Sequence, residues 1–277
     1  MMKNAAIITN MKKDKDLCVT KVLVDELKKY GWNVSFAEDL ISATGEGSVI
    51  SSDEKYDVCF VIGGDGTVLN AVNRYPHFTF IGINLGRMGF LTEIPSGEIA
   101  SAVKDITDGK YFTEERMMIN VSAGDVSVDA LNEVSIKHKV ASGIGEFKVF
   151  VNDVFLAHYE ADGIIVATPT GSTAYNLSAG GPILSPACEG MILQSICSHS
   201  MNARGVVVSA SEDITVMFDK DESHVMADGD ILDIDTDAIR VRKSEKTIRL
   251  MHLSKYNFYN SLFEKIKQPN YLRGGLS

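Results

Sequence analysis

The sequence predicts an α/β nucleotide-binding domain at the N-terminus, joined to an all-β sandwich domain at the C-terminus. Up to about residue 111, short apolar runs alternate with segments of helical spacing, as in a sheet covered by helices. Beyond that point the segments become short, β-rich and separated by turn residues, which is typical of a sandwich. With 277 residues, of which 45% are hydrophobic and 23% charged, the chain is long enough to give each domain its own core.

The first domain is predicted over residues 1–112. Its expected strands are 5–9, 34–37, 58–62 and 79–84, and its expected helices are 17–30, 67–75 and 94–108. Gly31 and Gly109 are expected to end the first and last helices, because glycine readily adopts the conformation that follows a helix. Residues 42–54, rich in glycine, serine and acidic side chains, are predicted to form a mobile surface loop. Alternating strands and helices indicate a parallel sheet that binds ligands beyond the carboxyl ends of its strands.

The second domain is predicted over residues 113–255 as a β-sandwich. Its expected strands are 117–122, 126–131, 133–137, 147–151, 154–158, 164–167, 205–209, 214–218, 231–236, 239–242 and 247–253. Asn152 and Asp153 separate two of these runs and predict a tight hairpin. The C-terminal segment 256–277, helical over 257–267, is expected to pack back on the first domain.

Charge and composition exclude several classes of protein. A net charge of −10 argues against a nucleic-acid partner held by bulk electrostatics. No apolar run reaches the roughly 18 residues that span a bilayer, and the first residues lack a signal-peptide pattern. The four cysteines and six histidines show no metal-ligand spacing, so no metal-binding residue is assigned. We expect buried free thiols, a reducing compartment, and therefore a cytoplasmic protein without a membrane partner.

The stretch Gly63–Thr67 is the first segment that carries chemistry. It follows the apolar run 58–62 and precedes a segment that can open a helix. Three glycines let the backbone come close to a ligand, and amide groups at a helix N-terminus attract phosphates. Asp65 is unexpected there, because a carboxylate repels phosphate unless a cation or a chemical task keeps it in place. The alternative interpretation is a tight strand-to-helix turn in which Asp65 is a capping residue.

Two further segments contain polar side chains that could bind a ligand. Residues 162–182 form a strand followed by a loop rich in hydroxyl groups, glycine and proline, suited to the edges and hydroxyls of a nucleoside. A Pro/Gly turn whose hydroxyls satisfy the local backbone is the alternative. The pair Asn132-Glu133 interrupts an apolar strand, and these side chains either face solvent or hold the hydroxyls of a ligand.

Taken together, these segments resemble the NAD kinase family, which phosphorylates the 2′-hydroxyl of the adenosine ribose of NAD to give NADP. The matching motifs, in order, are Gly63–Thr67, Asn132-Glu133 and Asp162–Pro182, with a similar loop at Asn84–Leu91 and a weaker match at Ala227-Asp228-Gly229. Diacylglycerol kinases, sphingosine kinases and phosphofructokinases share the glycine-Asp element. The long hydroxyl-rich stretch is the part that discriminates.

The resemblance implies a role for each matching position. Asp65 would be the general base that takes the proton from the ribose hydroxyl. The binding residues carried over are Gly64, Gly66, Thr67, Phe90, Asn132, Glu133, Asp162, Thr173, Ala174, Tyr175, Ser178 and Asp228. The glycine-loop members would approach phosphates, Phe90 would form an apolar wall, Asn132-Glu133 would bind the ribose, and the later positions would contact adenine, ribose or nicotinamide.

The same resemblance implies ATP or inorganic polyphosphate as donor, with Mg²⁺ or another divalent ion and no prosthetic group. It also implies a homo-oligomer, a dimer or a tetramer. Two other functions remain open at this point. A lipid kinase of the diacylglycerol or sphingosine type would share the glycine-Asp element, and a non-catalytic NAD(P)-sensing protein would bind without turnover. These residues do not determine whether the donor is ATP or polyphosphate, or whether the acceptor is NAD or NADH.

Overall fold

In the computed structural model the chain divides into two compact units. Unit 1 comprises Met1–Glu114 and Arg249–Ser277, and unit 2 comprises Glu115–Ile248. The residues that the structure describes are 3–44, 47–51, 54–86, 89–139, 143–200, 203–253 and 256–266. The chain passes between the units along two long strands, β7 (Tyr111–Ala123) and β18 (Ala238–Leu253). The sequence predicts the boundaries between the two domains near residues 112 and 255.

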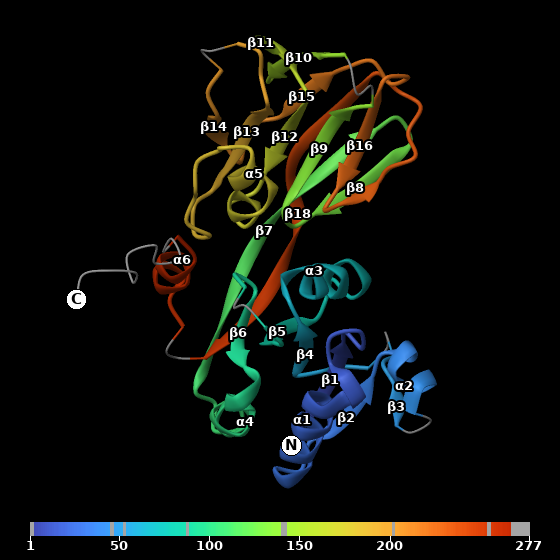
Figure 1. Ribbon diagram of the computed structural model, residues 1–277, viewed down its shortest axis with the longest axis vertical. Helices are drawn as coiled ribbons and strands as arrows, with labels where there is room; N and C mark the ends of the chain where they lie inside the picture. Colours follow the sequence, from blue (N-terminus) through green and yellow to red (C-terminus); the bar gives the residue numbers. More distant parts are fainter. Residues whose placement is uncertain are drawn as a thin grey trace, which may run out of the picture. The chain divides into compact units, whose positions relative to one another are not determined.

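Unit 1 is an α/β domain with a parallel sheet, as predicted (Figure 1). Its strands are β1 (Asn4–Thr9), β2 (Asn33–Phe36), β3 (Ser48–Val49), β4 (Val58–Gly63), β5 (Thr79–Asn84) and β6 (Thr92–Pro95). Its helices are α1 (Cys18–Lys29), α2 (Glu38–Thr44), α3 (Asp65–Arg74), α4 (Ile99–Thr107) and α6 (Phe258–Ile266). The strand order is β18-β5-β4-β1-β2-β3, with β6 also parallel to β5. The carboxyl end of central strand β4 therefore leads directly into α3.

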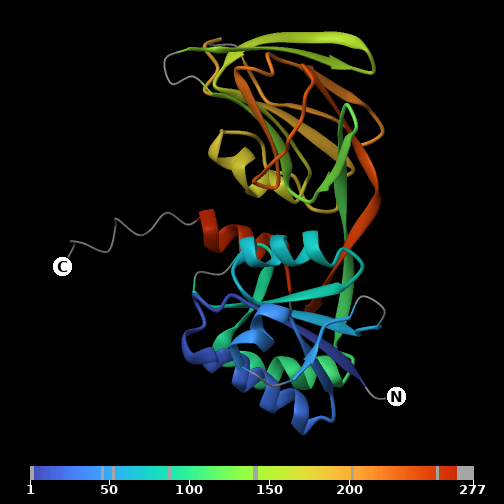
Figure 2. The same cartoon turned by 90° about the vertical axis from the view of Figure 1, so that its right-hand side faces the viewer.

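Helices cover both faces of this sheet. The cluster on one face joins α1 and α4 to alternate residues of the central strands, namely Leu23, Leu27, Ile99, Val103, Ile106, Ile7, Phe60 and Ile62. Figure 2 shows α1 and α4 on that face and α3 on the other. Every residue of β4 is buried, which explains why its sequence is a continuous apolar run and not an alternating one. Burial on both sides fixes the end of β4, and with it the start of α3.

Two predictions in unit 1 are corrected by the structure. The helix expected over 94–108 begins only at Ile99, because Thr92–Pro95 is strand β6 and Ser96–Glu98 is a 3-10 turn. Pro95 has an extended backbone, and proline offers no amide hydrogen to a helix. The loop expected over 42–54 contains the end of α2 and the short strand β3, although residues 45, 46, 52 and 53 lie outside the described residues. Gly31 ends α1 with a φ of 73°, as predicted.

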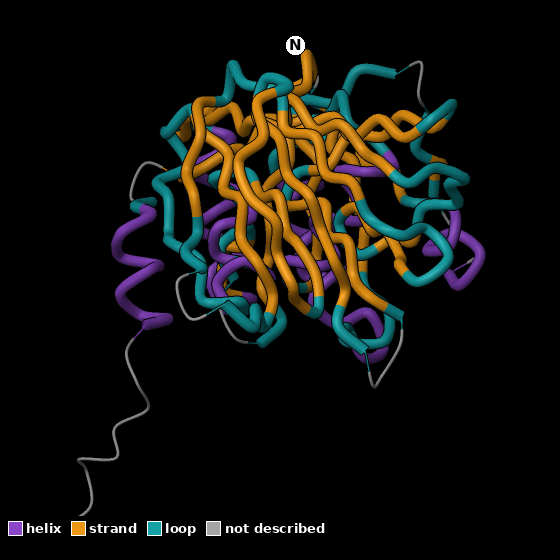
Figure 3. Tube along the Cα trace, turned by 90° about the horizontal axis from the view of Figure 1, so that it is seen from above, coloured by secondary structure: helices purple, strands orange, loops and turns teal. Residues whose placement is uncertain are grey.

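Unit 2 is a β-sandwich. One sheet has the antiparallel order β14-β13-β12-β9-β16-β17, and the other contains β11-β10-β15-β18, with β7 paired to β18 and β8. The bounds are β8 (Val126–Ala130), β9 (Glu133–His138), β10 (Gly145–Val151), β11 (Val154–Ala161), β12 (Gly163–Ala167), β13 (Gly190–Ile196), β14 (Val206–Ser209), β15 (Ile214–Met217), β16 (Ser223–Ala227) and β17 (Asp230–Ile231). Neighbouring strands run side by side in Figure 3.

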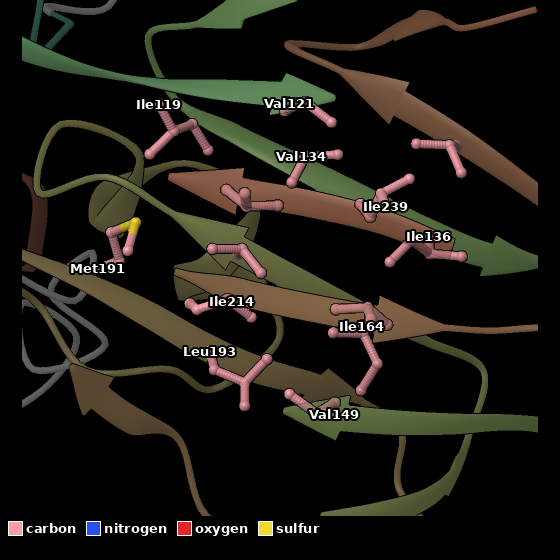
Figure 4. Packing of buried hydrophobic residues seen from close by; sticks show 14 of the residues in the cluster. Ile119, Val121, Val134, Ile136, Val149, Ile164, Met191, Leu193, Ile214 and Ile239 are labelled. Carbon is pink, nitrogen blue, oxygen red and sulfur yellow. The ribbon is translucent and has the colours of Figure 1, made fainter. Parts of the chain in front are cut away.

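The inner faces of the two sheets enclose a single apolar cluster. Figure 4 shows its labelled members: Ile119, Val121, Val134, Ile136, Val149, Ile164, Met191, Leu193, Ile214 and Ile239. On β12 the residues alternate, so that Ile165 and Ala167 point to the opposite face, where Tyr175 and Leu184 pack against their cluster. The hydroxyl-rich loop after β12 therefore folds back over the outer face of its own sheet.

The strand predictions in unit 2 are correct for most of the chain. The hairpin at Asn152-Asp153 is confirmed: both residues have positive φ, 49° and 63°, and Val151 pairs with Val154. Strands β13 and β16 were not predicted, and the strand expected over 231–236 is only Asp230–Ile231. Residues 239–242 and 247–253 belong to one continuous strand, β18. All seven residues of β13 are buried, so it lacks the alternation that would have revealed it.

A first prediction concerns the close approach of β5 and β6. A Cβ atom added at Gly82 would lie 2.6 Å from the carbonyl oxygen of Leu91 and 2.8 Å from the Cα of Thr92. Because these are backbone atoms, Gly82→Ala should lower the free energy of unfolding by about 1–3 kcal/mol. Chemical denaturation measures this, with Gly97→Ala as the control, since its Cβ meets no atom within 4 Å. Equal free energies of unfolding for the two variants would contradict the close contact of Gly82 with the backbone of Leu91 and Thr92.

Candidate functional site

Asp65 is the first residue of α3, directly after the N-cap residue Gly64. The glycine loop that precedes it is tight: a Cβ atom at Gly63 would lie 2.3 Å from the Oγ1 of Thr67. That hydroxyl accepts hydrogen bonds from the amide of Gly64 and the side-chain amide of Asn10, each at 3.4 Å. A Cβ atom at Gly66, in contrast, meets nothing within 4 Å. Contacts with Thr67 therefore hold the loop at Gly63 and Gly64, whereas no atom covers it at Gly66.

The carboxylate of Asp65 is held by a second loop, the one between β5 and β6. Its Oδ2 accepts the amide hydrogen of Phe90 at 2.7 Å, and its Oδ1 accepts that of Leu91 at 3.0 Å. The hydroxyl of Thr92 lies 3.4 Å from Oδ1. The N-cap residue of α3 is Gly64, and Asp65 is already inside the helix, so the interpretation of Asp65 as the capping residue is wrong. The side chain remains 35% exposed, which leaves it accessible to a ligand.

Gly89 leaves the space that this arrangement needs. A Cβ atom at Gly89 would lie 1.6 Å from Oδ1 of Asp65, well inside any tolerated contact. Arg87 and Met88, which belong to the loop that resembles the family motif, lie outside the described residues.

A lysine that the sequence interpretation missed lies beside this carboxylate. The Nζ of Lys265 is 3.7 Å from Oδ2 of Asp65 and 3.8 Å from the centre of the Phe90 ring. Burial lowers the pKa of Lys265, and the negative charge of Asp65 opposes that effect. Lys265 lies on α6, seven residues after Phe258, on the helix face expected to be apolar. A cation at an apolar position of the predicted tail helix was the available signal.

In unit 2, Asp228 fixes the backbone at the start of β9. Its carboxylate accepts amide hydrogens from Leu131 and Asn132, both at 2.7 Å, and from Glu133 at 3.2 Å. Asp228 itself has a φ of 50° in the turn after β16. Burial raises the pKa of Asp228 more than these hydrogen bonds lower it. Asp228 thus positions the Asn132-Glu133 pair through the backbone.

Glu133 has an unsatisfied buried oxygen. Its Oε2 has no hydrogen-bond partner among the described residues. Burial, reinforced by the charge of Asp228, raises the pKa of Glu133 to about 7, although a backbone hydrogen bond from Tyr175 and the charge of Lys137 act against the rise. A buried acceptor without a partner costs free energy, so a ligand hydroxyl at this point would be favourable. The solvent-facing interpretation of this pair does not hold for Glu133.

The loop after β12 is tied to the same corner of the sheet. Thr168 donates its hydroxyl to the carbonyl of Leu131 at 2.6 Å and its amide to that of Asn132 at 2.8 Å. A Cβ atom at Gly171 would lie 2.0 Å from the carbonyl oxygen of Asn132. Local turns use part of the hydroxyl content, since Thr173 donates to the carbonyl of Thr170 at 3.2 Å. The interpretation of this loop as a turn that satisfies its own backbone holds for Thr168 and Thr173, and the nucleoside-binding interpretation stays a prediction.

The remaining predicted positions differ in how they relate to this corner. The loop places Thr173, Ala174 and Tyr175 next to Glu133, and the Nζ of Lys137 lies 4.2 Å from the centre of the Tyr175 ring. Ser178 is exposed at the end of α5 (Tyr175–Ser178). Asp162 is exposed and precedes β12, at the opposite end of that strand from Thr168. At about 3.3 Å per residue, this separates it from the Glu133 corner by roughly 20 Å.

Metals, membranes and thiols give few further features. Across the described ranges, no group of three or more His, Cys, Asp or Glu side chains is arranged to hold a metal ion. No helix in the part of the chain that the structure describes is long and apolar enough to cross a membrane. The four cysteines are free thiols, as expected, but only Cys59 is buried; Cys18, Cys188 and Cys197 are exposed, which corrects the expectation that they are buried.

Comparison with known protein families identifies both halves of the chain. Residues 6–111 match the ATP-NAD kinase N-terminal domain, and residues 131–253 match the ATP-NAD kinase C-terminal domain. The chain belongs to the NAD kinase family. It is therefore an enzyme, a kinase, and the family resemblance of the motifs is confirmed.

Relatives with this name extend over nearly the whole chain. The NAD kinase of Caldanaerobacter subterraneus is 37% identical over 282 residues, covering 96% of this chain and 100% of the relative. That of Caldicellulosiruptor saccharolyticus is 38% identical over 218 residues, covering 77% of this chain and 84% of the relative.

Solved structures agree with the fold. The crystal structure of an NAD kinase from Archaeoglobus fulgidus in complex with ATP has a TM-score of 0.78 at 27% identity, covering 95% of this chain and 98% of the other. The yeast NADH kinase complexed with NADH has a TM-score of 0.85 at 20% identity, covering 100% of this chain and 89% of the other. The α/β and sandwich organisation of the chain is that of NAD kinases.

A second prediction tests the space around Asp65. Gly89→Ala should displace the carboxylate, because the added methyl group would overlap Oδ1. We expect the rate of NADP formation to fall by about 100-fold, on the scale of a catalytic group moved by about 1 Å. Gly86→Ala is the matched control, since its Cβ meets no atom within 4 Å. Full activity of the Gly89→Ala variant would show that NADP formation does not depend on the observed position of the Asp65 carboxylate.

A third prediction follows from the raised pKa of Glu133. Because the folded-state pKa lies near 7 and the unperturbed value is 4.5, the stabilisation is complete below about pH 4.5 and is lost as the pH rises through 7. The loss amounts to roughly 3 kcal/mol at most. Unfolding of the ligand-free protein, measured from pH 5 to 8, should show this decline, and Glu133→Gln should flatten it. A Glu133→Gln variant with the same pH dependence as the parent would contradict the assignment.

Proposed function

We propose that this kinase transfers the γ-phosphoryl group of ATP to the 2′-hydroxyl of the adenosine ribose of NAD, with Asp65 as the general base. The observation that carries the proposal is the fixed carboxylate of Asp65 at the first turn of α3, inside a glycine loop of an NAD kinase fold. A pure phosphate-binding loop would gain nothing from a carboxylate, because its charge repels the ligand. A proton acceptor at the point of transfer explains its presence.

The role of Asp65 is to orient the ribose hydroxyl and take its proton. Phosphoryl transfer has a loose transition state, so positioning and charge stabilisation supply most of the rate, and a weak base is sufficient. The amides of Phe90 and Leu91 hold the carboxylate in one orientation. Proton transfer therefore begins from a preset geometry.

The donor phosphates are assigned to the start of α3. Amide groups there point toward a bound anion, and the helix dipole favours negative charge. The backbone is open to a phosphate at Gly66, where a Cβ atom would meet nothing within 4 Å, and at Gly64 the nearest atom to a Cβ would be the Nζ of Lys13, at 3.7 Å. Thr67 supports the loop through its hydroxyl, and Phe90 supplies an apolar ring beside it.

The acceptor nucleoside is assigned to unit 2. The unsatisfied Oε2 of Glu133 would accept a ribose hydroxyl, with the carboxamide of Asn132 beside it. The ring of Tyr175 and the backbone of Thr173 and Ala174 would contact the adenine, and Ser178 lies at the rim. Asp228 acts through the backbone of this corner. Asp162, at the far end of β12, would contact a different part of NAD, on the nicotinamide side.

A divalent ion is proposed to enter with the nucleotide. The described residues form no metal cage, which fits an ion held mainly by phosphate oxygens and water, as Mg²⁺ usually is in kinases. When bound, it would screen the charge between the phosphates and Asp65. We also propose that polyphosphate is an alternative donor, that the chain assembles into a homo-oligomer, and that it is located in the cytoplasm.

A fourth prediction tests the base. Asp65→Asn keeps the size of the side chain but removes its basicity, so NADP formation from ATP, Mg²⁺ and NAD should fall by about 100-fold or more. NAD binding, measured by calorimetry, should stay close to that of the parent. Asp105→Asn, at an exposed ion pair on α4, is the control and should remain active.

The outcomes separate the alternatives. Retention of more than a tenth of the parent rate by Asp65→Asn would remove the base from the proposal. A parent that binds NAD tightly but forms no NADP would favour the sensing function. Phosphorylation of a diacylglycerol in place of NAD would favour the lipid-kinase function. Parallel assays with ATP and polyphosphate, on NAD and NADH, define the substrates.

A further inference from the structure

The C-terminal helix α6 is docked on the loop that holds Asp65. The ring of Phe258 lies 6.0 Å from that of Phe90, at an angle of 37°. Asn257 begins the helix by accepting the amide hydrogens of Tyr259 at 2.9 Å and Asn260 at 3.3 Å. Two turns further on, the same helix face presents Lys265 to Phe90 and Asp65.

The contact between Lys265 and Asp65 is too long to satisfy the ammonium group. Charge-assisted hydrogen bonds between nitrogen and oxygen are about 2.7–2.9 Å, whereas Nζ lies 3.7 Å from Oδ2. The carboxylate is already occupied by the shorter bonds from the amides of Phe90 and Leu91. An ammonium group has three donors, and those of Lys265 find no closer partner among the described residues.

The surroundings of Lys265 favour the arrival of another anion. The side chain is 31% exposed, so its charge is partly removed from water and still open on one side. The ring of Phe90 beneath it excludes water from the other side. In a partly desolvated setting a lysine gains more from a second anion than a solvated one does. Lys265 also lies close to the start of α3, where we expect the phosphates, because Asp65 is the first residue of that helix.

We propose that Lys265 is a substrate-binding residue of the kinase reaction, whose ammonium group contacts an anionic oxygen of the phosphoryl donor beside Asp65. This rests on the proposed function, which assigns the donor phosphates to the start of α3. In the ligand-free protein the same ammonium group neutralises part of the charge of Asp65. When the donor binds, Lys265 offsets the repulsion between the phosphates and that carboxylate.

The competing explanation is a structural contact without a ligand. A cation over a ring, paired loosely with a carboxylate, adds a little to the stability of a protein and has no effect on the binding of substrates. The two explanations differ in one observable, the affinity for the donor. They can be separated without turnover.

The test measures the dissociation constants of ATP and of inorganic polyphosphate by calorimetry, in the full-length chain and without NAD. Lys265→Met keeps the stem that lies on Phe90 and removes the charge, so it should weaken donor binding about 10- to 100-fold. Lys265→Arg should retain most of the affinity. Lys104→Met removes an exposed lysine that pairs with Asp108 on α4, and should bind as the parent does. Thermal unfolding of each variant checks that the fold is kept.

A second variant separates contact with the donor from neutralisation of Asp65. In the Asp65→Asn background the ion pair is already absent. Lys265→Met should still weaken donor binding there by at least tenfold if the ammonium group touches the donor. In turnover assays the KM for ATP should rise while the KM for NAD stays within about twofold.

Each outcome decides the proposal. Donor affinity of Lys265→Met within about twofold of the parent, in both backgrounds, would overturn it in favour of the structural contact. An effect that disappears in the Asp65→Asn background would also overturn it, and would assign Lys265 to positioning Asp65. A parent that binds ATP but forms no NADP would contradict the proposed function, and the binding ratio would still decide the role of Lys265. A parent that binds neither donor would overturn both.

Discussion

The pair of hydrogen bonds from the amides of Phe90 and Leu91 to the carboxylate of Asp65 is the constraint on which the rest of unit 1 depends. It joins the end of β4 to the loop that follows β5, two points 25 residues apart in the chain. The buried parallel strands fix those points, because neither strand can shift without moving its apolar residues out of the core. The carboxylate that we propose as the general base is thereby held by backbone amides, whose positions are fixed by the strands.

Unit 2 uses the same device for a different purpose. The carboxylate of Asp228 holds three consecutive amides, those of Leu131, Asn132 and Glu133. Asp228 thus accepts three hydrogen bonds, whereas Oε2 of the nearby Glu133 has no hydrogen-bond partner among the described residues. Asp228 therefore has a structural role, whereas we propose that Glu133 binds a ligand hydroxyl. Burial of Glu133, together with the negative charge of Asp228, raises the pKa of Glu133.

Much of this organisation was predictable from the sequence because it depends on local signals. Continuous apolar runs indicated buried parallel strands, and the glycine loop indicated the sharp turn from β4 into α3. The Asn152-Asp153 hairpin followed from turn chemistry alone. Strand β13 was missed because a fully buried strand has no alternation, and β6 because its apolar residues also fit a helical pattern.

What the sequence could not provide were contacts between distant segments. The partners of Asp65, the clamp formed by Asp228 and the approach of Lys265 depend on how the strands are ordered, and no local pattern contains that information. The resemblance grouped Asp162 with the nucleoside contacts because it begins the same motif. A strand separates it from the others, and distance along an extended strand grows by about 3.3 Å per residue.

Chemical rescue is the measurement that tests the central claim most directly. Asp65→Ala leaves a space lined by the amides of Phe90 and Leu91, which can bind a small carboxylate such as formate. If Asp65 is the general base, added formate should restore NADP formation in a saturable manner, and chloride at equal ionic strength should not. A rate that stays at the level of the variant in formate, while NAD and ATP still bind, would contradict the account.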